Sequence, residues 1–161
     1  QQEHDELQSL GLTTEEVDLR DFFDNQAALP QRLDRFGLLW FRGGNTFLLR
    51  RALAQSGADK YLRSRLADSN LVYGGYSAGA CVLCPTLKGI DLADEPDFAP
   101  APYKPGVPWD GLGFVPYCLV PHYQSDHFES VMMENVVEFY QANNLPYRTL
   151  RDGEVIIAQT H

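Results

Sequence analysis

The sequence predicts an α/β domain built on a largely parallel sheet. Short apolar segments, the size of buried strands, alternate along the chain with segments of helical composition or spacing. The length of 161 residues is close to the usual size of one domain. A hydrophobic fraction of 44% with 22% charged residues is typical of a globular protein. We therefore expect residues 1–161 to form a single α/β domain.

The first clear strand is predicted at 37–42, which is short and apolar and ends at a pair of glycines. Asn45 is suited to cap a helix over 46–55, which is rich in Leu, Arg and Ala. After a glycine break, residues 58–66 continue with helical composition. Residues 70–74 are again short and apolar, and they predict the second strand.

The second half of the chain continues this alternation. A sharp turn over 75–79 leads into a helix of small residues. The proline-rich residues 88–110 predict a long irregular loop, a kind of segment that often serves function. Residues 111–121 predict a third strand, 128–143 a helix with apolar residues at helical spacing, and 153–159 a closing strand.

Charge and cysteine content exclude several functions. The 13 Lys and Arg face 22 Asp and Glu, and the net charge of −9 disfavours nucleic acid and anionic membranes as partners. No apolar run approaches the roughly 18 residues of a membrane-spanning helix. Three cysteines do not suggest a secreted disulfide framework, so we expect a reducing compartment and a cytoplasmic location.

The clearest chemical signal is the G-x-S-x-G stretch over 75–79, which lies between a predicted strand and a predicted helix. A nucleophile elbow needs small residues around its serine, here Gly75, Ala78 and Gly79, because the backbone turns too tightly for larger side chains. The amide of Ala78, at the start of the following helix, would point toward an oxyanion formed on the serine. A simple glycine-rich turn is the alternative.

A serine nucleophile needs a histidine base and a carboxylate that orients it. His122 is favoured over His127 because it lies at the predicted carboxyl end of a strand, where open α/β sheets place their sites. The chain order of α/β-hydrolases places the acid between serine and histidine. The loop there offers several acids, among which spacing alone does not choose: Asp91, Asp94, Glu95 and Asp97.

Other groups give weaker signals. The C-x-x-C formed by Cys81 and Cys84 is better explained by packing on a buried helix than by redox chemistry. His122, Asp126 and His127 are metal-ligand types, but no zinc-binding motif supports them, and we expect neither metal nor cofactor. Several arginines could dock a substrate carboxylate, although most helix arginines only face solvent: Arg42, Arg50, Arg51, Arg63 and Arg65.

Four blocks together carry a more specific resemblance: 41–47 (FRGGNTF), 75–80 (GYSAGA), 85–86 (PT) and 120–123 (VPHY). In order and spacing they resemble the peptidase E family of serine peptidases, which includes aspartyl dipeptidase and cyanophycinase. The resemblance implies a flavodoxin-like fold related to class I glutamine amidotransferases, with helices on both faces of a mostly parallel sheet.

The resemblance also implies roles for individual residues. Ser77 would be the nucleophile and His122 the base, while Gly44 and Ala78 would supply the oxyanion amides. Family members place an acid shortly after the Pro-Thr block, where Asp94 is the best match. Asp91 is the second choice, and Glu95 and His127 remain alternates.

Two departures from the family pattern matter. A Gly-Glu-Thr-Arg stretch contributes to recognition of an N-terminal aspartate in peptidase E, whereas residues 124–130 here read QSDHFES. With residues 147–154, this favours a less characterised branch of the family. Family members also begin with an apolar strand and continue beyond the position of His161, so we expect a fragment truncated at both ends. Exposed sheet edges would then favour self-association, for example as a homodimer.

The sequence therefore predicts a serine peptidase or dipeptidase that cleaves a small peptide or related amide through an acyl-enzyme. Two rival functions stay open. An esterase or acyl transferase could use the same triad, because an elbow reveals the nucleophile but little about the leaving group. A non-catalytic binding protein on the same fold is the other.

Overall fold

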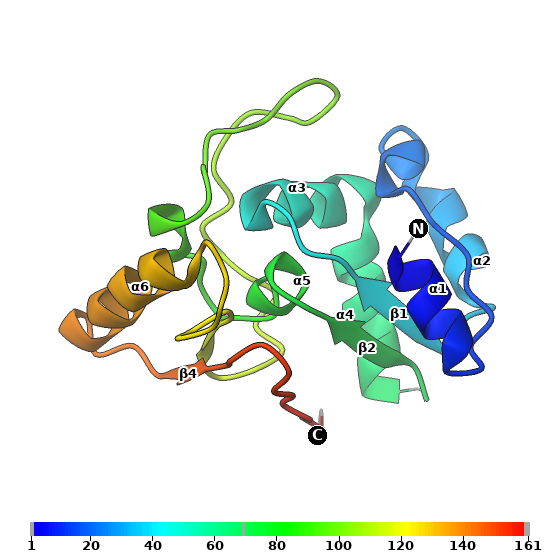
Figure 1. Ribbon diagram of the computed structural model, residues 1–161. Helices are drawn as coiled ribbons and strands as arrows, with labels where there is room; N and C mark the ends of the chain where they lie inside the picture. The colour runs from blue at the N-terminus through cyan, green and yellow to red at the C-terminus, as the bar shows by residue number, and fades with distance from the viewer. Residues whose placement is uncertain (1, 69, 160–161) are drawn as a thin grey trace.

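The computed structural model describes residues 2–68 and 70–159 (Figure 1). Its helices and strands follow in this order: α1 (Gln2–Ser9), η1 (Leu19–Phe22), η2 (Gln26–Ala28), α2 (Leu29–Leu33), β1 (Leu38–Phe41), α3 (Thr46–Ser56), α4 (Ala58–Asp68), β2 (Val72–Gly75), α5 (Ala78–Cys81), η3 (Ile90–Leu92), β3 (Cys118–Val120), α6 (Ser130–Ala142) and β4 (Tyr147–Thr149). The strands form two parallel pairs, β1 with β2 and β3 with β4.

The β1–β2 pair has one buried and one open face, because side chains alternate along each strand. Leu39 packs into a core with residues of α3 and α4, and Phe41 stacks on Tyr73 at 4.6 Å between ring centroids. On the opposite face Trp40 and Val72 remain 44% and 56% exposed. The predicted strands at 37–42 and 70–74 are confirmed, with small shifts at their ends.

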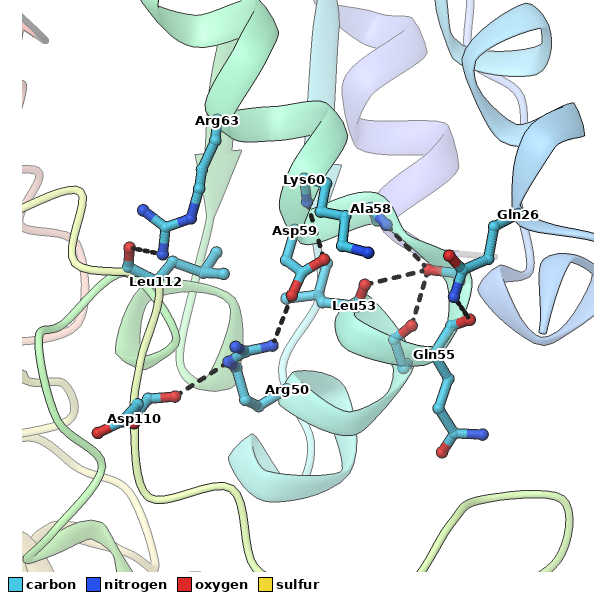
Figure 2. A network of polar contacts seen from close by, with 12 residues as sticks. Gln26, Arg50, Leu53, Gln55, Ala58, Asp59, Lys60, Arg63, Asp110 and Leu112 are labelled. Atoms are coloured by element: carbon cyan, nitrogen blue, oxygen red, sulfur yellow. Dashed lines mark hydrogen bonds and ion pairs between the residues drawn. The ribbon is translucent and has the colours of Figure 1, made fainter.

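Helices α3 and α4 form where the sequence predicted them. The side chain of Asn45 caps α3 by accepting a hydrogen bond from the Leu48 amide at 2.8 Å, and Gly57 ends the helix in the left-handed conformation. Figure 2 shows the polar contacts around this junction. Arg50 bridges Asp59 on α4 and the carbonyl of Asp110, and Arg63 donates to the carbonyl of Leu112.

Arginines that could have bound substrate instead hold the chain together. The extended loop at the top of Figure 1 begins and ends beside α3. Arg51 is 5% exposed and donates hydrogen bonds to the carbonyls of Pro96 and Gly106, which close the base of this loop. Buried carbonyls without partners are costly, so a guanidinium at this position satisfies several of them at once.

The second half of the chain departs from prediction at two strands. Only Cys118–Val120 of residues 111–121 forms a strand, because amides of the earlier part donate to carbonyls after α5, among them Leu112 to Val82 and Phe114 to Leu83. The predicted strand at 153–159 is wrong. Val155 and Ile157 lie 80% and 90% exposed, and the strand that pairs with β3 is β4.

Helix α5 lies between the two strand pairs and separates two apolar cores (Figure 1). Its small residues, Ala80 and Cys81, belong to the core around β3 and α6, while Val82 just beyond it belongs to the core around β1, α3 and α4. Cys81 and Cys84 are buried and free, as the packing explanation predicted. Within the described ranges, no helix has both the length and the apolar character needed to cross a bilayer.

Candidate active site

Ser77 occupies a strained turn between β2 and α5. Its φ of 50° and ψ of −118° fall where side-chain-bearing residues are rarely found. Such a conformation costs on the order of 1–3 kcal/mol and persists only where surrounding contacts impose it. The Ser77 carbonyl accepts hydrogen bonds from the amides of Ala80 and Cys81, both at 2.9 Å. The turn therefore fixes the backbone that presents the serine hydroxyl.

The glycines of this turn are required by the approach of β1. A Cβ added to Gly79 would lie 2.2 Å from the Phe41 carbonyl oxygen, and one added to Gly75 would lie 2.9 Å from the same atom. A Cβ on Gly43 would lie 3.2 Å from the Cβ of Ser77. The end of β1 thus packs directly against the serine, as a nucleophile elbow requires.

Two backbone amides beside Ser77 remain available to a bound oxyanion. Among the hydrogen bonds of the described residues, neither the Gly44 amide nor the Ala78 amide has an acceptor. Ala78 is the first residue of α5, so its amide also lies at the positive end of that helix. Gly44 adopts a φ of 134°, which L side chains rarely tolerate.

The acid that the sequence favoured, Asp94, has a different partner in the structure. Its carboxylate accepts a hydrogen bond from the Thr46 amide at 2.8 Å and so caps the start of α3. Glu95 receives the side-chain amide of Asn45 on its backbone carbonyl, and Asp91 accepts from the amide of Gly89. The acidic loop therefore braces the Gly43-Gly44-Asn45 turn and does not orient the histidine.

Asp152 is the carboxylate that meets His122. Nδ1 of His122 lies 2.7 Å from Oδ1 of Asp152. An ionised carboxylate only accepts hydrogen bonds, so Nδ1 carries a proton, and in the neutral ring Nε2 then presents a lone pair. The ladder of β3 and β4 continues through Leu150, whose amide bonds the Val120 carbonyl, and this brings the following residues beside His122.

Two further groups crowd His122. The ring of His127 stacks on it with centroids 3.7 Å apart and an interplanar angle of 9°. Oε2 of Glu129 lies 3.9 Å from Nε2 of His122 and 3.9 Å from Nδ1 of His127. The two histidines that the sequence offered as alternatives thus lie side by side in the structure. The chain between β3 and α6 supplies all three side chains.

The serine and the histidine reach the site from different strand pairs. Helix α5, whose N-cap residue is Ser77, contacts both β2 and β3. Its Cys81 is close enough to Asp94 and Glu129 for their charges, in addition to burial, to raise the pKa of the thiol. Among the described residues, no hydrogen bond joins the Ser77 hydroxyl to His122.

Sequence reasoning missed Asp152 and Glu129. The chain order of α/β-hydrolases, which places the acid between serine and histidine, points to the loop over 91–97 instead. A usable signal was nevertheless present. Residues 151–153 (RDG) form a turn signal shortly after a possible strand partner of β3, and acids in such turns lie at the carboxyl edge of a parallel sheet.

Comparison with known proteins decides the family. A family model described as peptidase family S51 matches residues 1–161. The chain belongs to peptidase family S51. An uncharacterized peptidase of Listeria innocua, Lin0382, is 31% identical over 157 residues, which span 93% of this chain and 71% of that relative. Peptidase E of Streptomyces coelicolor is 32% identical over 142 residues, which span 85% of this chain and 54% of that protein.

A solved structure agrees with this assignment. The structure described as a peptidase E protein from Listeria monocytogenes EGD-e matches with a TM-score of 0.69 and 28% identity, covering 95% of this chain and 73% of that one. The resemblance to peptidase E, the flavodoxin-like α/β fold and the prediction of a serine-type peptidase are thereby confirmed for this S51 chain.

Proposed function

We propose that this S51 chain hydrolyses a small peptide through a triad of Ser77, His122 and Asp152. The observation that supports the triad most is the 2.7 Å contact between Asp152 and Nδ1 of His122. It holds the imidazole in the tautomer whose Nε2 can accept a proton. Asp152 thus replaces Asp94 as the acid of the triad, while Ser77 and His122 keep the roles that the sequence predicted.

The proposed reaction has two steps. Nε2 of His122 removes the hydroxyl proton as Oγ of Ser77 attacks the scissile carbonyl carbon, and the same proton passes to the leaving amine when the acyl-enzyme forms. Water then attacks the ester, His122 again takes and returns a proton, and the acid product leaves. Asp152 stabilises the imidazolium in both steps. A hydrogen bond between a catalytic serine and its histidine often forms or shortens only when substrate is bound.

The oxyanion of each tetrahedral intermediate would be held by the amides of Gly44 and Ala78. Both amides are without acceptors in the described chain, so they need no rearrangement before the charge develops. The Asn45 cap and the Asp94 contact to Thr46 hold the first of these amides in place. Removal of one such donor commonly lowers the rate about 100-fold or more.

The substrate is proposed to be a short peptide without a required N-terminal aspartate. Residues 124–130 lack the Gly-Glu-Thr-Arg stretch, and Glu129 adds negative charge beside His122. An aspartate side chain would be repelled there. We further propose a cytoplasmic location and a homodimer formed through exposed sheet edges.

Replacement of Ser77 by Ala tests the proposal most simply. The variant should lose labelling by a fluorophosphonate and turnover of a library of short peptides, while Ser64→Ala, on α4, should retain both. Equal labelling of Ser77→Ala and the parent chain would overturn the proposed nucleophile. Turnover of p-nitrophenyl esters without any peptide turnover would instead indicate an esterase, and labelling without turnover of either would indicate a binding protein.

A further inference from the structure

We propose that His122, His127 and Glu129 form a binding site for Zn²⁺, and that a bound Zn²⁺ switches the peptidase site off. The metal-binding part rests on the positions of these three side chains and not on the proposed function. Its inhibitory effect rests on the proposed function of His122 as base. The sequence considered Asp126 as a ligand beside the two histidines, but the structure places Glu129 there and leaves Asp126 exposed.

The three ligand atoms are already gathered. Nε2 of His122, Nδ1 of His127 and Oε2 of Glu129 are the facing atoms, and one ligand atom from each residue lies within 4.8 Å of the other two. Within residues 2–68 and 70–159, no other group of three such residues meets this condition. The side chains are 12%, 27% and 18% exposed, so the cluster is shielded from solvent but reachable.

The hydrogen bonds around the cluster are compatible with a metal on each of these atoms. Nδ1 of His122 donates to Asp152, so in the neutral ring Nε2 presents a lone pair. Nδ1 of His127 accepts a hydrogen bond from the Glu129 amide at 3.2 Å, so it carries no proton, and a metal would replace that hydrogen bond. The third atom is a carboxylate oxygen. With His122 neutral, its Nε2 and Oε2 of Glu129 face each other without a proton between them, and a cation placed there would remove their repulsion.

Asp152 completes the pattern of a zinc site in its outer shell. Histidines that bind zinc usually donate their second ring N–H to a carboxylate, which fixes the tautomer and strengthens the ligand. The contact between Asp152 and His122 has this form. The charges of Glu129 and Asp152 together balance the two positive charges of the metal. Two imidazoles and one carboxylate favour zinc over magnesium or calcium, which prefer oxygen ligands alone.

Binding requires a small rearrangement. Ligand atoms of a tetrahedral zinc site lie about 3.3 Å apart, so the present 3.9 Å separations must shorten by roughly 0.6 Å. A metal lies in the plane of each imidazole that holds it, and two parallel stacked rings cannot share one metal in that way. The ring of His127, more than a quarter exposed, must therefore turn out of its stack on His122.

Bound zinc and catalysis exclude each other because both need the same lone pair. Nε2 of His122 accepts the serine proton in the proposed reaction, and it cannot do so while it coordinates a metal. Removal of zinc by a chelator would restore the base. The site is thus a reversible inhibitory site and not the source of a metal-activated water.

Titration calorimetry with ZnCl₂ on the chelator-treated full chain tests the site without reference to activity. One equivalent should bind, and His127→Gln and Glu129→Gln should each weaken binding by roughly tenfold or more. Asp126→Asn, a neighbouring acid outside the set, is the matched control and should bind as the parent does. Unchanged affinity in both His127→Gln and Glu129→Gln would overturn the site.

Fluorophosphonate labelling tests the inhibition. One equivalent of Zn²⁺ should slow labelling of the parent chain at least tenfold, and EDTA should restore the original rate. The rate for His127→Gln is compared with the rate of the same variant without metal. This variant should need about tenfold more zinc for the same slowing. Binding without any change in labelling would overturn the inhibitory role, and a faster rate with zinc would do the same. Absence of labelling even without metal would instead overturn the proposed function and leave the calorimetric result standing.

Discussion

The two halves of the site are built in different ways. Around Ser77, the backbone itself fixes the geometry, through a strained turn, glycines in contact with β1, and helix α5 directly behind. Around His122, side chains from the loop before α6 and from the turn after β4 fix it, and Asp152 is 49% exposed. The proposed nucleophile, Ser77, is held by backbone contacts, whereas the proposed base, His122, is held by side chains, one of which is half exposed.

The largest expected effect comes from a change to the half around Ser77. Gly79→Ala forces a Cβ to within 2.2 Å of the Phe41 carbonyl oxygen, and backbone on both sides must move. We expect a loss of about 3 kcal/mol or more in the free energy of unfolding, measured by urea denaturation. Gly37→Ala, which meets nothing within 4 Å, is the control and should change stability little. Equal stability of both variants would contradict the packing described for the turn.

A second pair of variants separates the two acids. Asp152→Asn should lower the rate of fluorophosphonate labelling about 100-fold, because the imidazole loses the partner that fixes its tautomer. Asp94→Asn should stay within about twofold of the parent, since Asn can still accept the Thr46 amide. A larger loss of labelling in Asp94→Asn than in Asp152→Asn would indicate that Asp94 is the acid of the triad.

The stability of the chain at alkaline pH tests the burial of the Cys81 thiol on helix α5. Burial and nearby carboxylates raise the pKa of the Cys81 thiol above its usual value of 9.0. Below pH 9 the thiol is protonated in both states and has no effect. Above it only the unfolded chain ionises, so stability falls by up to about 1.4 kcal/mol per pH unit. Cys81→Ala should have a shallower decline between pH 9 and 10, and an unchanged slope would show that the thiol is not shielded.

The smallest expected effect comes from the hydrogen bonds of Asn45, the residue after Gly44, whose amide is proposed to bind the oxyanion. Asn45→Ala removes the hydrogen bond to the Leu48 amide and the contact to the Glu95 carbonyl. We expect a loss of about 1 kcal/mol in the free energy of unfolding. Labelling of Ser77 should slow only modestly. A large loss of labelling at unchanged stability would mean that Asn45 contacts the reacting groups directly.

The same contrast explains what the sequence could predict. The turn at Ser77, the Asn45 cap and helices α3, α4 and α6 follow from local rules of glycine placement, capping and apolar spacing, and they are found as predicted. The partner of His122 depends on which strand pairs with β3. That strand, Tyr147–Thr149, is too short and too polar to be predicted, so the turn signal at 151–153 could not be placed at the sheet edge beside His122.

The failed strand predictions have a related cause. Residues 111–117 have strand-like composition. The amides of 111–115, however, donate hydrogen bonds to carbonyls that follow the short helix α5. These tertiary contacts outweigh the local strand propensity. Residues 153–159 are also apolar enough for a strand. In the described chain they pair with no strand, and Val155 and Ile157 are exposed.

The most direct test of the account asks whether His122 and Asp152 act as one unit on Ser77. The rate of fluorophosphonate labelling should be measured for His122→Ala, Asp152→Asn and the double variant, with the modified residue identified by mass spectrometry. We predict an adduct on Ser77 and a double variant no slower than His122→Ala alone, because the carboxylate acts only through the imidazole. Effects that multiply independently, or an adduct on another residue, would contradict the account.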